Sequence, residues 1–161
     1  MSRLLGLDLG ERRIGIAVAD LATGSIRPLT TLSRGKDITR DARSIARLAA
    51  EQRATELVIG LPLSLDGSTG PQAKATMAWS ERIHALTGLP IALRDERLTT
   101  ERAKVRLGAP SRGRSGAPPG ERRRRAHDAR LDREAATLIL QAELDARAEV
   151  PSAGNGASTT R

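Results

Sequence analysis

The chain has 161 residues, with 27 Lys and Arg against 19 Asp and Glu, a net charge of +8 and a pI near 11.3. This length suits one domain with a single hydrophobic core. The excess of basic residues favours polyanionic partners, with nucleic acid ahead of membrane surfaces, and the alternative is an Arg-rich surface that is merely solvated. The absence of Cys excludes disulfides, thiolate metal sites and thiol catalysis, and one Trp without Phe or Tyr leaves almost no aromatic platform for stacking on single strands.

The first third of the chain predicts three strands. Residues 3–8 and 12–20 are apolar runs joined by the turn "LGE", so they should pair as a hairpin. In the second run the large residues at 14, 16 and 18 share one face, and the small residues at 15, 17 and 19 share the other. A third run, residues 25–32, contains Pro28, which predicts a position at the edge of the sheet.

The remaining chain alternates helices and strands. Its periodicity predicts helices over residues 38–52, 71–87, 99–107 and 129–148, with strands over 56–62 and 90–96. Residues 108–127, rich in Gly, Pro, Ser and Arg, predict a flexible basic loop, and residues 149–161 predict a disordered tail. The order predicts an α/β protein whose mixed sheet has antiparallel hairpins at one edge. No stretch resembles a signal peptide or a membrane span, so we expect a cytoplasmic protein.

Four acidic residues lie where such a sheet places its chemistry. Asp8 ends the first strand, Asp95 and Glu96 end the last strand, and Asp132 lies near the start of the last helix. Ligands of α/β sheets bind beyond the carboxyl ends of parallel strands, where these carboxylates should gather. Gathered carboxylates repel one another, and Mg²⁺, which takes oxygen ligands, relieves that repulsion. One or two such ions can activate water and stabilise the leaving oxygen of a phosphodiester.

Each carboxylate also has a plainer interpretation. Asp8 could be a turn former before Gly10. The pair at the end of the last strand could be solvated or bound to the arginines at 94 and 97, and Asp132 could simply favour a helix N-terminus. Asp128, one helical turn before Asp132, is the substitute candidate. The metal site is the stronger hypothesis because three unrelated segments lead to the same edge.

Four blocks of the chain carry a family resemblance. In order along the chain, "LLGLDLGERRIGIAVAD", "LVIGLPLSLDGS", "RDERLTT" and "LDREAATLILQ" together resemble the YqgF family, also called RuvX, which is associated with Holliday junction resolution and with maturation of pre-16S ribosomal RNA. The resemblance implies a ribonuclease H-like nuclease domain over residues 1–148, with a mixed five-stranded sheet flanked by helices. It further implies that Asp8, Glu96 and Asp132 are the catalytic, metal-binding triad, beside which Asp95 has a less defined role.

Basic residues and glycines complete the predicted site. Six arginines precede the helix that carries Asp132, in a loop longer than the family usually has, and we expect them to hold phosphates near the metal; a solvated charge run is the alternative. These residues are Arg112, Arg114, Arg122, Arg123, Arg124 and Arg125. Gly10 and Gly15 predict places where a nucleic-acid backbone approaches closely.

The predicted function is that of an Mg²⁺-dependent nuclease, with Mn²⁺ as the alternative ion. The family resemblance favours RNA, with processing of the 5′ end of pre-16S rRNA in ribosome biogenesis, on precursor particles or free RNA. The alternative is resolution of four-way DNA junctions, which requires two active sites and hence a homodimer; monomer and homodimer both stay open. An actin-like ATPase or sugar kinase would need two domains, and a non-catalytic nucleic-acid-binding protein would not need the three carboxylates.

Overall fold

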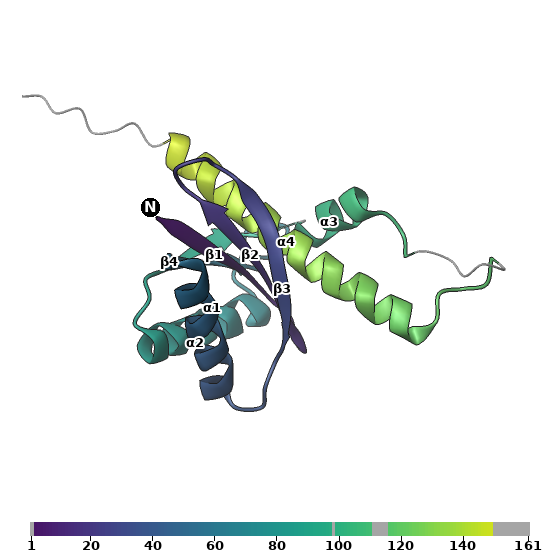
Figure 1. Cartoon of the computed structure of the whole chain (residues 1–161), viewed down its shortest axis with the longest axis horizontal. Helices are drawn as coiled ribbons and strands as arrows, with labels where there is room; N and C mark the ends of the chain where they lie inside the picture. Colours follow the sequence, from purple (N-terminus) through teal and green to yellow (C-terminus); the bar gives the residue numbers. More distant parts are fainter. Residues whose placement is uncertain (1, 98, 111–115, 150–161) are drawn as a thin grey trace, which may run out of the picture.

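The structure is a computed structural model that describes residues 2–97, 99–110 and 116–149 (Figure 1). The strands are β1 Arg3–Leu9, β2 Arg13–Asp20, β3 Ile26–Ser33, β4 Ala54–Leu61 and β5 Ile91–Asp95, and the helices are α1 Ile38–Gln52, α2 Pro71–Thr87, α3 Thr99–Leu107 and α4 Glu121–Glu149. Among the described residues, no helix combines the length and the apolar character needed to cross a membrane. The predicted tail lies outside the described residues from position 150 onward.

The five strands form one mixed sheet in the order β3-β2-β1-β4-β5. β1 pairs antiparallel with β2 and β2 with β3, whereas β4 runs parallel to both β1 and β5. The predicted mixed sheet is therefore confirmed. Pro28 lies in the edge strand β3, and the β2–β3 register shifts between Ile16 and Ala17, where Pro28 faces Ala17. A proline is tolerated there because an edge strand has a side without ladder hydrogen bonds.

Helices cover both faces of the sheet and bury two different kinds of residue (Figure 1). On one face α1 and α2 pack against large aliphatic side chains of the strands, among them Leu5, Leu7, Ile14 and Ile16, all fully buried. On the other face α4 packs against smaller residues of β2, such as Ala17 and the alanine at 19. The alternation of large and small residues along β2 thus assigns one face to a helix pair and the other to a single closely packed helix.

Glycines bring α4 into direct contact with the sheet. A Cβ at Gly15 would lie 2.0 Å from the main-chain oxygen of Asp132, and a Cβ at Gly6 would lie 2.9 Å from that of Ala136. We predicted that a nucleic-acid backbone approaches Gly15 closely. A backbone does approach it closely, but it is not that of a nucleic acid, so the predicted partner is wrong. The backbone that approaches Gly15 is that of α4, which leaves no room for a ligand at this position.

The last helix begins earlier than predicted. Residues 121–127, expected to be part of the flexible basic loop, form the first turns of α4, and the helix continues to Glu149. Gly, Pro and Ser end at Gly120; the segment that follows contains only residues compatible with a helix, and Arg is a good helix former. Glu121 and Arg125 form an ion pair one turn apart, which supports this start. The first turns of α4 are exposed and project past the sheet as an arm (Figure 1).

Candidate active site

Two of the predicted carboxyls meet at the edge of the sheet where β1, β4 and β5 end. Asp8 is the last but one residue of β1, and Glu96 directly follows β5. The strand between them, β4, presents Gly60 at this level, and a Cβ there would lie 2.3 Å from Oε2 of Glu96. Because Gly60 has no side chain, the Glu96 carboxyl reaches across β4 and shares a hydrogen bond with Asp8.

This carboxyl pair holds a proton at neutral pH. Burial, with the nearby charge of Asp132 as a smaller cause, raises the pKa of Asp8 to about 6 even though its hydrogen bond with Glu96 acts in the opposite direction. Burial together with the negative charge of Asp8 raises the pKa of Glu96 to about 9. Two carboxyls that share a partly buried site cannot both ionise cheaply, so the pair titrates as a unit, with Glu96 the protonated member.

Asp132 reaches the same cavity but has a cationic partner. Its Oδ2 accepts a hydrogen bond of 2.6 Å from Nε of Arg13 on β2, and Asp128 lies 4.0 Å from the same guanidinium. Consequently, the described residues include no group of three acidic or histidine side chains close enough to hold a metal ion. The structure thus brings two members of the predicted triad together and places the third on the cavity wall, held by Arg13.

Asp95 does not join the carboxyl pair. Its side chain accepts hydrogen bonds from the Arg97 amide, at 2.9 Å, and from the Arg97 guanidinium, at 2.7 Å, and these bonds lower the pKa of Asp95. Arg97 also donates to the main-chain oxygen of Leu65, at 3.2 Å. Asp95 therefore orients Arg97 and the loop after β4. The arginine at 94 instead binds Glu143 of α4, at 2.7 Å.

The carboxyl pair opens into a cavity of about 380 Å³, within the range of ligand-binding cavities. It is lined by Asp8, Leu9, Gly10, Pro62, Leu63, Leu65, Gln72, Glu96, Arg97 and Asp132. Leu65 at its mouth is 76 % exposed, an unusual state for a large apolar side chain. Sequence reasoning missed Gly60 and the roles of Arg13 and Arg97. Only Arg97 left a signal, as a proposed partner of Asp95.

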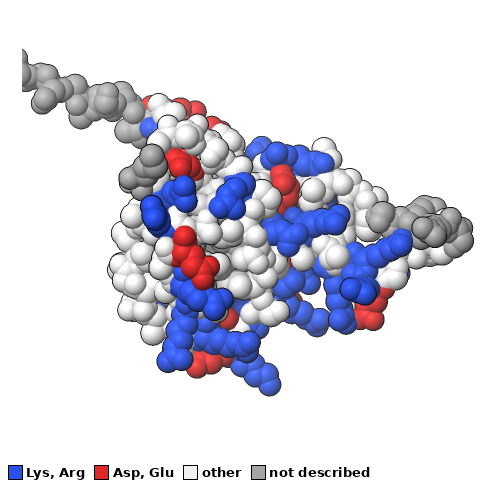
Figure 2. Space-filling view, viewed as in Figure 1, with Lys and Arg blue, Asp and Glu red and all other residues white. Residues whose placement is uncertain are grey.

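The predicted phosphate-binding residues lie apart from this cavity. Arg122, Arg123, Arg124 and Arg125 are exposed on the α4 arm, where Lys and Arg side chains gather in Figure 2. Arg112 and Arg114 lie outside the described residues. Gly10 closes the β1–β2 turn through a hydrogen bond of 2.9 Å from its amide to the Arg13 oxygen, and it lines the cavity. Of the two predicted glycines, Gly10 alone faces the site.

A divalent cation fits the carboxyl pair. Asp8 and Glu96 supply oxygen donors, the type that Mg²⁺ and Mn²⁺ accept in proteins. Burial and the negative charge of Asp8 raise the pKa of Glu96, and a bound cation would counter that charge and allow both groups to ionise. Asp132 lies on the same wall, where Arg13 holds its carboxylate at 2.6 Å.

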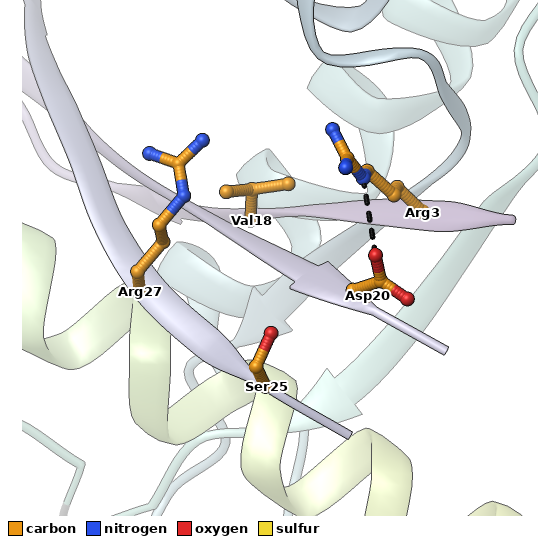
Figure 3. Close-up of a pocket in the computed structure, with 5 residues that line it drawn as sticks. All are labelled: Arg3, Val18, Asp20, Ser25 and Arg27. Carbon is orange, nitrogen blue, oxygen red and sulfur yellow. Dashed lines mark hydrogen bonds and ion pairs between the residues drawn. The ribbon is translucent and has the colours of Figure 1, made fainter. Parts of the chain in front are cut away.

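A second pocket lies at the opposite end of the strands (Figure 3). It is lined by Arg3, Val18, Asp20, Ser25 and Arg27, and Arg3 donates a hydrogen bond of 3.4 Å to Asp20. The β1–β2 register pairs Arg3 with Asp20 at one end of the hairpin and Asp8 with Gly15 at the other. This pocket is therefore separate from the carboxyl pair.

Comparisons with known proteins agree on one family. Residues 2–146 match the family model described as "RuvX: Holliday junction resolvase". A protein of Anaeromyxobacter sp. (strain K) named "Putative pre-16S rRNA nuclease" is 41 % identical over 91 % of this chain and 98 % of its own length, and a protein of that name from Synechococcus elongatus is 42 % identical over 90 % of each. The fold is similar to that of T. thermophilus RuvC in complex with a Holliday junction substrate, with a TM-score of 0.51 and 13 % identity over 92 % of this chain and 97 % of that one.

Proposed function

The chain belongs to the RuvX family, and from this membership and its carboxyl-lined cavity we propose that it is a nuclease that hydrolyses RNA with the help of a divalent cation. The proposed substrate is the 5′ region of pre-16S rRNA, because the chain matches proteins named pre-16S rRNA nucleases over nearly their whole length. Mg²⁺ is the proposed ion. The proposed catalytic residues are Asp8, Glu96 and Asp132.

The observation that carries this proposal is the carboxyl pair at the strand ends. Asp8 and Glu96 come from distant parts of the chain, meet over Gly60 and retain a proton that water-exposed carboxyls would lose. Such an arrangement costs the fold stability at neutral pH, because two carboxyls that would ionise in water are kept from doing so by burial and by each other. Strongly raised pKa values in a cavity are instead typical of functional sites.

The residues around the cavity suggest how hydrolysis is performed. Asp8 and Glu96 would hold the cation with Asp132, losing their shared proton as it binds. The bound cation would supply Lewis-acid polarisation of the phosphate and make a water more acidic. The described lining residues include no Ser, Cys or His, which agrees with water as the proposed nucleophile. Arg97 at the rim, oriented by Asp95, can bind a phosphate oxygen of the substrate.

A direct test combines two substrates with two variants. Labelled RNA carrying the 5′ precursor flank of 16S rRNA and a four-way DNA junction are each incubated with protein in Mg²⁺, in Mn²⁺ and in EDTA. We expect wild-type protein to cut the RNA in Mg²⁺ and not in EDTA. Asp8→Asn should abolish cleavage while circular dichroism shows an intact fold, and Asp20→Asn, at the opposite end of the strands, should retain cleavage as the matched control.

Resolution of DNA junctions is the second candidate because the matching family model is described in those words. Cleavage of the junction alone would leave the metal chemistry standing and replace the substrate. Salt-dependent binding of both substrates without cleavage in any metal would overturn the nuclease proposal and leave a nucleic-acid-binding protein.

A further inference from the structure

The catalytic cavity is one end of a longer groove. It shares Leu9, Gly10 and Gln72 with a neighbouring cavity that lies over the β1–β2 turn and the first turns of α2 and is lined in addition by Arg34. Arg34 in turn lines a third cavity at the start of α1. The three cavities therefore adjoin one another in sequence, from the carboxyl pair to the N-terminus of α1.

The far end of this groove is basic. Arg34, Lys36 and Arg82 line the third cavity, and Lys and Arg side chains gather at the lower edge of the molecule in Figure 2, where Figure 1 places the start of α1. Two carboxylates in this cavity already serve the fold. Asp37 caps α1 by accepting from the Thr39 amide at 2.9 Å, and Asp41 accepts from the Gly35 amide at 2.8 Å. Three basic and two acidic side chains line this cavity, so it keeps a net charge of +1, and its exposed cations are Lys36 and Arg82.

The groove has rigid walls. Arg34 donates a hydrogen bond of 2.9 Å to the main-chain oxygen of Gly10, and its amide bonds to the Arg12 oxygen at 2.8 Å, so the end of β3 is fixed to the β1–β2 turn. Trp79, only 6 % exposed, lines the third cavity from α2. One acidic side chain, Glu11, lies in the middle cavity and separates the catalytic carboxyls from the basic end.

We propose that this groove holds the polynucleotide strand that carries the cleaved phosphodiester, with Arg34, Lys36 and Arg82 binding phosphates of its flank beyond the β1–β2 turn. The proposal rests on the nuclease function above and adds the path of the substrate. An elongated groove that joins a hydrolytic site to three cations matches a polyanionic strand, whose phosphates repeat along its length. The α4 arm lies outside this groove and is a separate basic surface.

Binding measurements with matched neutral variants test this path. Lys36→Gln combined with Arg82→Gln removes two cations of the far end, and Arg27→Gln combined with Arg47→Gln removes two exposed cations outside the groove. Affinity for fluorescent single-stranded RNA is measured in EDTA as a function of salt and of RNA length. Each phosphate contact with a single strand changes log K by about 0.7 per tenfold change in salt, so the first variant should bind about 25-fold more weakly than wild type at 0.1 M salt and about equally at 1 M.

Two further features of the result distinguish the groove from a general charge effect. The difference between wild type and the Lys36/Arg82 variant should vanish when the RNA is shortened from one end, and the control variant should show a smaller loss at every length. Because Trp79 is the single Trp of the chain, its emission should change only with RNA long enough to reach the third cavity. Equal losses for both variants, or Trp79 emission that ignores RNA length, would overturn the path.

The same experiments separate this proposal from the proposed function. If no substrate is cleaved but the Lys36/Arg82 variant loses binding as described, the groove stands as a strand-binding path and the nuclease proposal falls. If RNA is cleaved and the Lys36/Arg82 variant binds like the control, the nuclease stands and the path falls.

Discussion

Replacing Glu96 by Gln should stabilise the metal-free protein while it abolishes cleavage. The pKa of Glu96 is raised from 4.5 in the unfolded chain to about 9 in the folded protein. A carboxyl with a raised folded pKa contributes stability that is fully present below its unfolded pKa and is lost as pH rises toward its folded pKa. Gln keeps the shape of the protonated side chain and has no proton to lose, so the variant does not share this loss.

The size of the effect follows from the two pKa values. At pH 7 Glu96 is ionised in the unfolded chain and protonated in the folded protein. Because pH 7 lies about 2.5 units above the unfolded pKa of 4.5, the loss of folding stability at 1.36 kcal/mol per unit is about 3 kcal/mol. The difference between variant and wild type should be near zero below pH 4.5 and grow by about 1.4 kcal/mol per pH unit up to the folded pKa. Asp8, whose pKa is raised to about 6 mainly by burial, is present in both proteins, so its own pH-dependent loss of stability largely cancels from the difference.

Urea unfolding at several pH values between 5 and 9, in EDTA, measures this difference through the fluorescence of the buried Trp79. Asp20→Asn, at the other end of the strands, is the control: a hydrogen bond from the Ala22 amide lowers the pKa of Asp20, so its replacement should remove stability above the unfolded pKa and show no growing gain. Adding Mg²⁺ should stabilise wild type and not Glu96→Gln. A difference that stays flat from pH 5 to pH 8 would refute the reasoning.

Three other variants have expected outcomes. Gly15→Ala should destabilise the fold by at least about 2 kcal/mol in thermal unfolding, because its Cβ would overlap the Asp132 oxygen of α4. Gly120→Ala is the control: its Cβ would meet no atom within 4 Å, so it should change stability little. Equal effects of the two variants would contradict the close packing of α4. Arg97→Gln should raise KM more than it lowers kcat and reduce the salt slope of RNA binding by about 0.7; an unchanged slope would exclude a phosphate contact. Gln at all of Arg122 to Arg125 should weaken binding more at 50 mM than at 200 mM salt without changing Tm, and a uniform loss at both salts would count against phosphate binding by the arm.

Hydrophobic periodicity was sufficient to predict the order of the strands and helices. As expected, α2 begins at Pro71 and is terminated by Gly88, which lies in the left-handed region at φ 71°. The predicted start of α4 is wrong because residues 108–127 do not share one conformation, although their composition is basic throughout. Gly and Pro, which disfavour helices, end at Gly120, and the arginines that follow favour a helix and gain an ion pair with Glu121.

The partners of the charged residues could not be predicted from sequence. Asp132 and Arg13 are separated by 119 positions, and no pattern in the chain relates them. For Asp95, two neighbouring arginines were equally available, and the structure assigns Arg97 to it while Arg94 turns to the buried Glu143 on α4. Such choices depend on which face of the sheet each residue occupies after folding, and spacing along the chain does not contain that information.

Three glycines explain why carboxylates from a strand, a loop and a helix can line one cavity. Gly6, Gly15 and Gly60 lie on β1, β2 and β4, on the face that α4 covers, and a Cβ at any of them would overlap α4 or Glu96. With larger residues there, α4 would sit farther from the sheet and Asp132 would leave the wall of the cavity. Glycine loses more conformational freedom on folding than other residues and buries no side chain, so these three positions lower the stability of the fold. The site therefore depends on residues without chemistry of their own, and substitutions at them should reduce activity by moving Asp132 and Glu96 relative to Asp8.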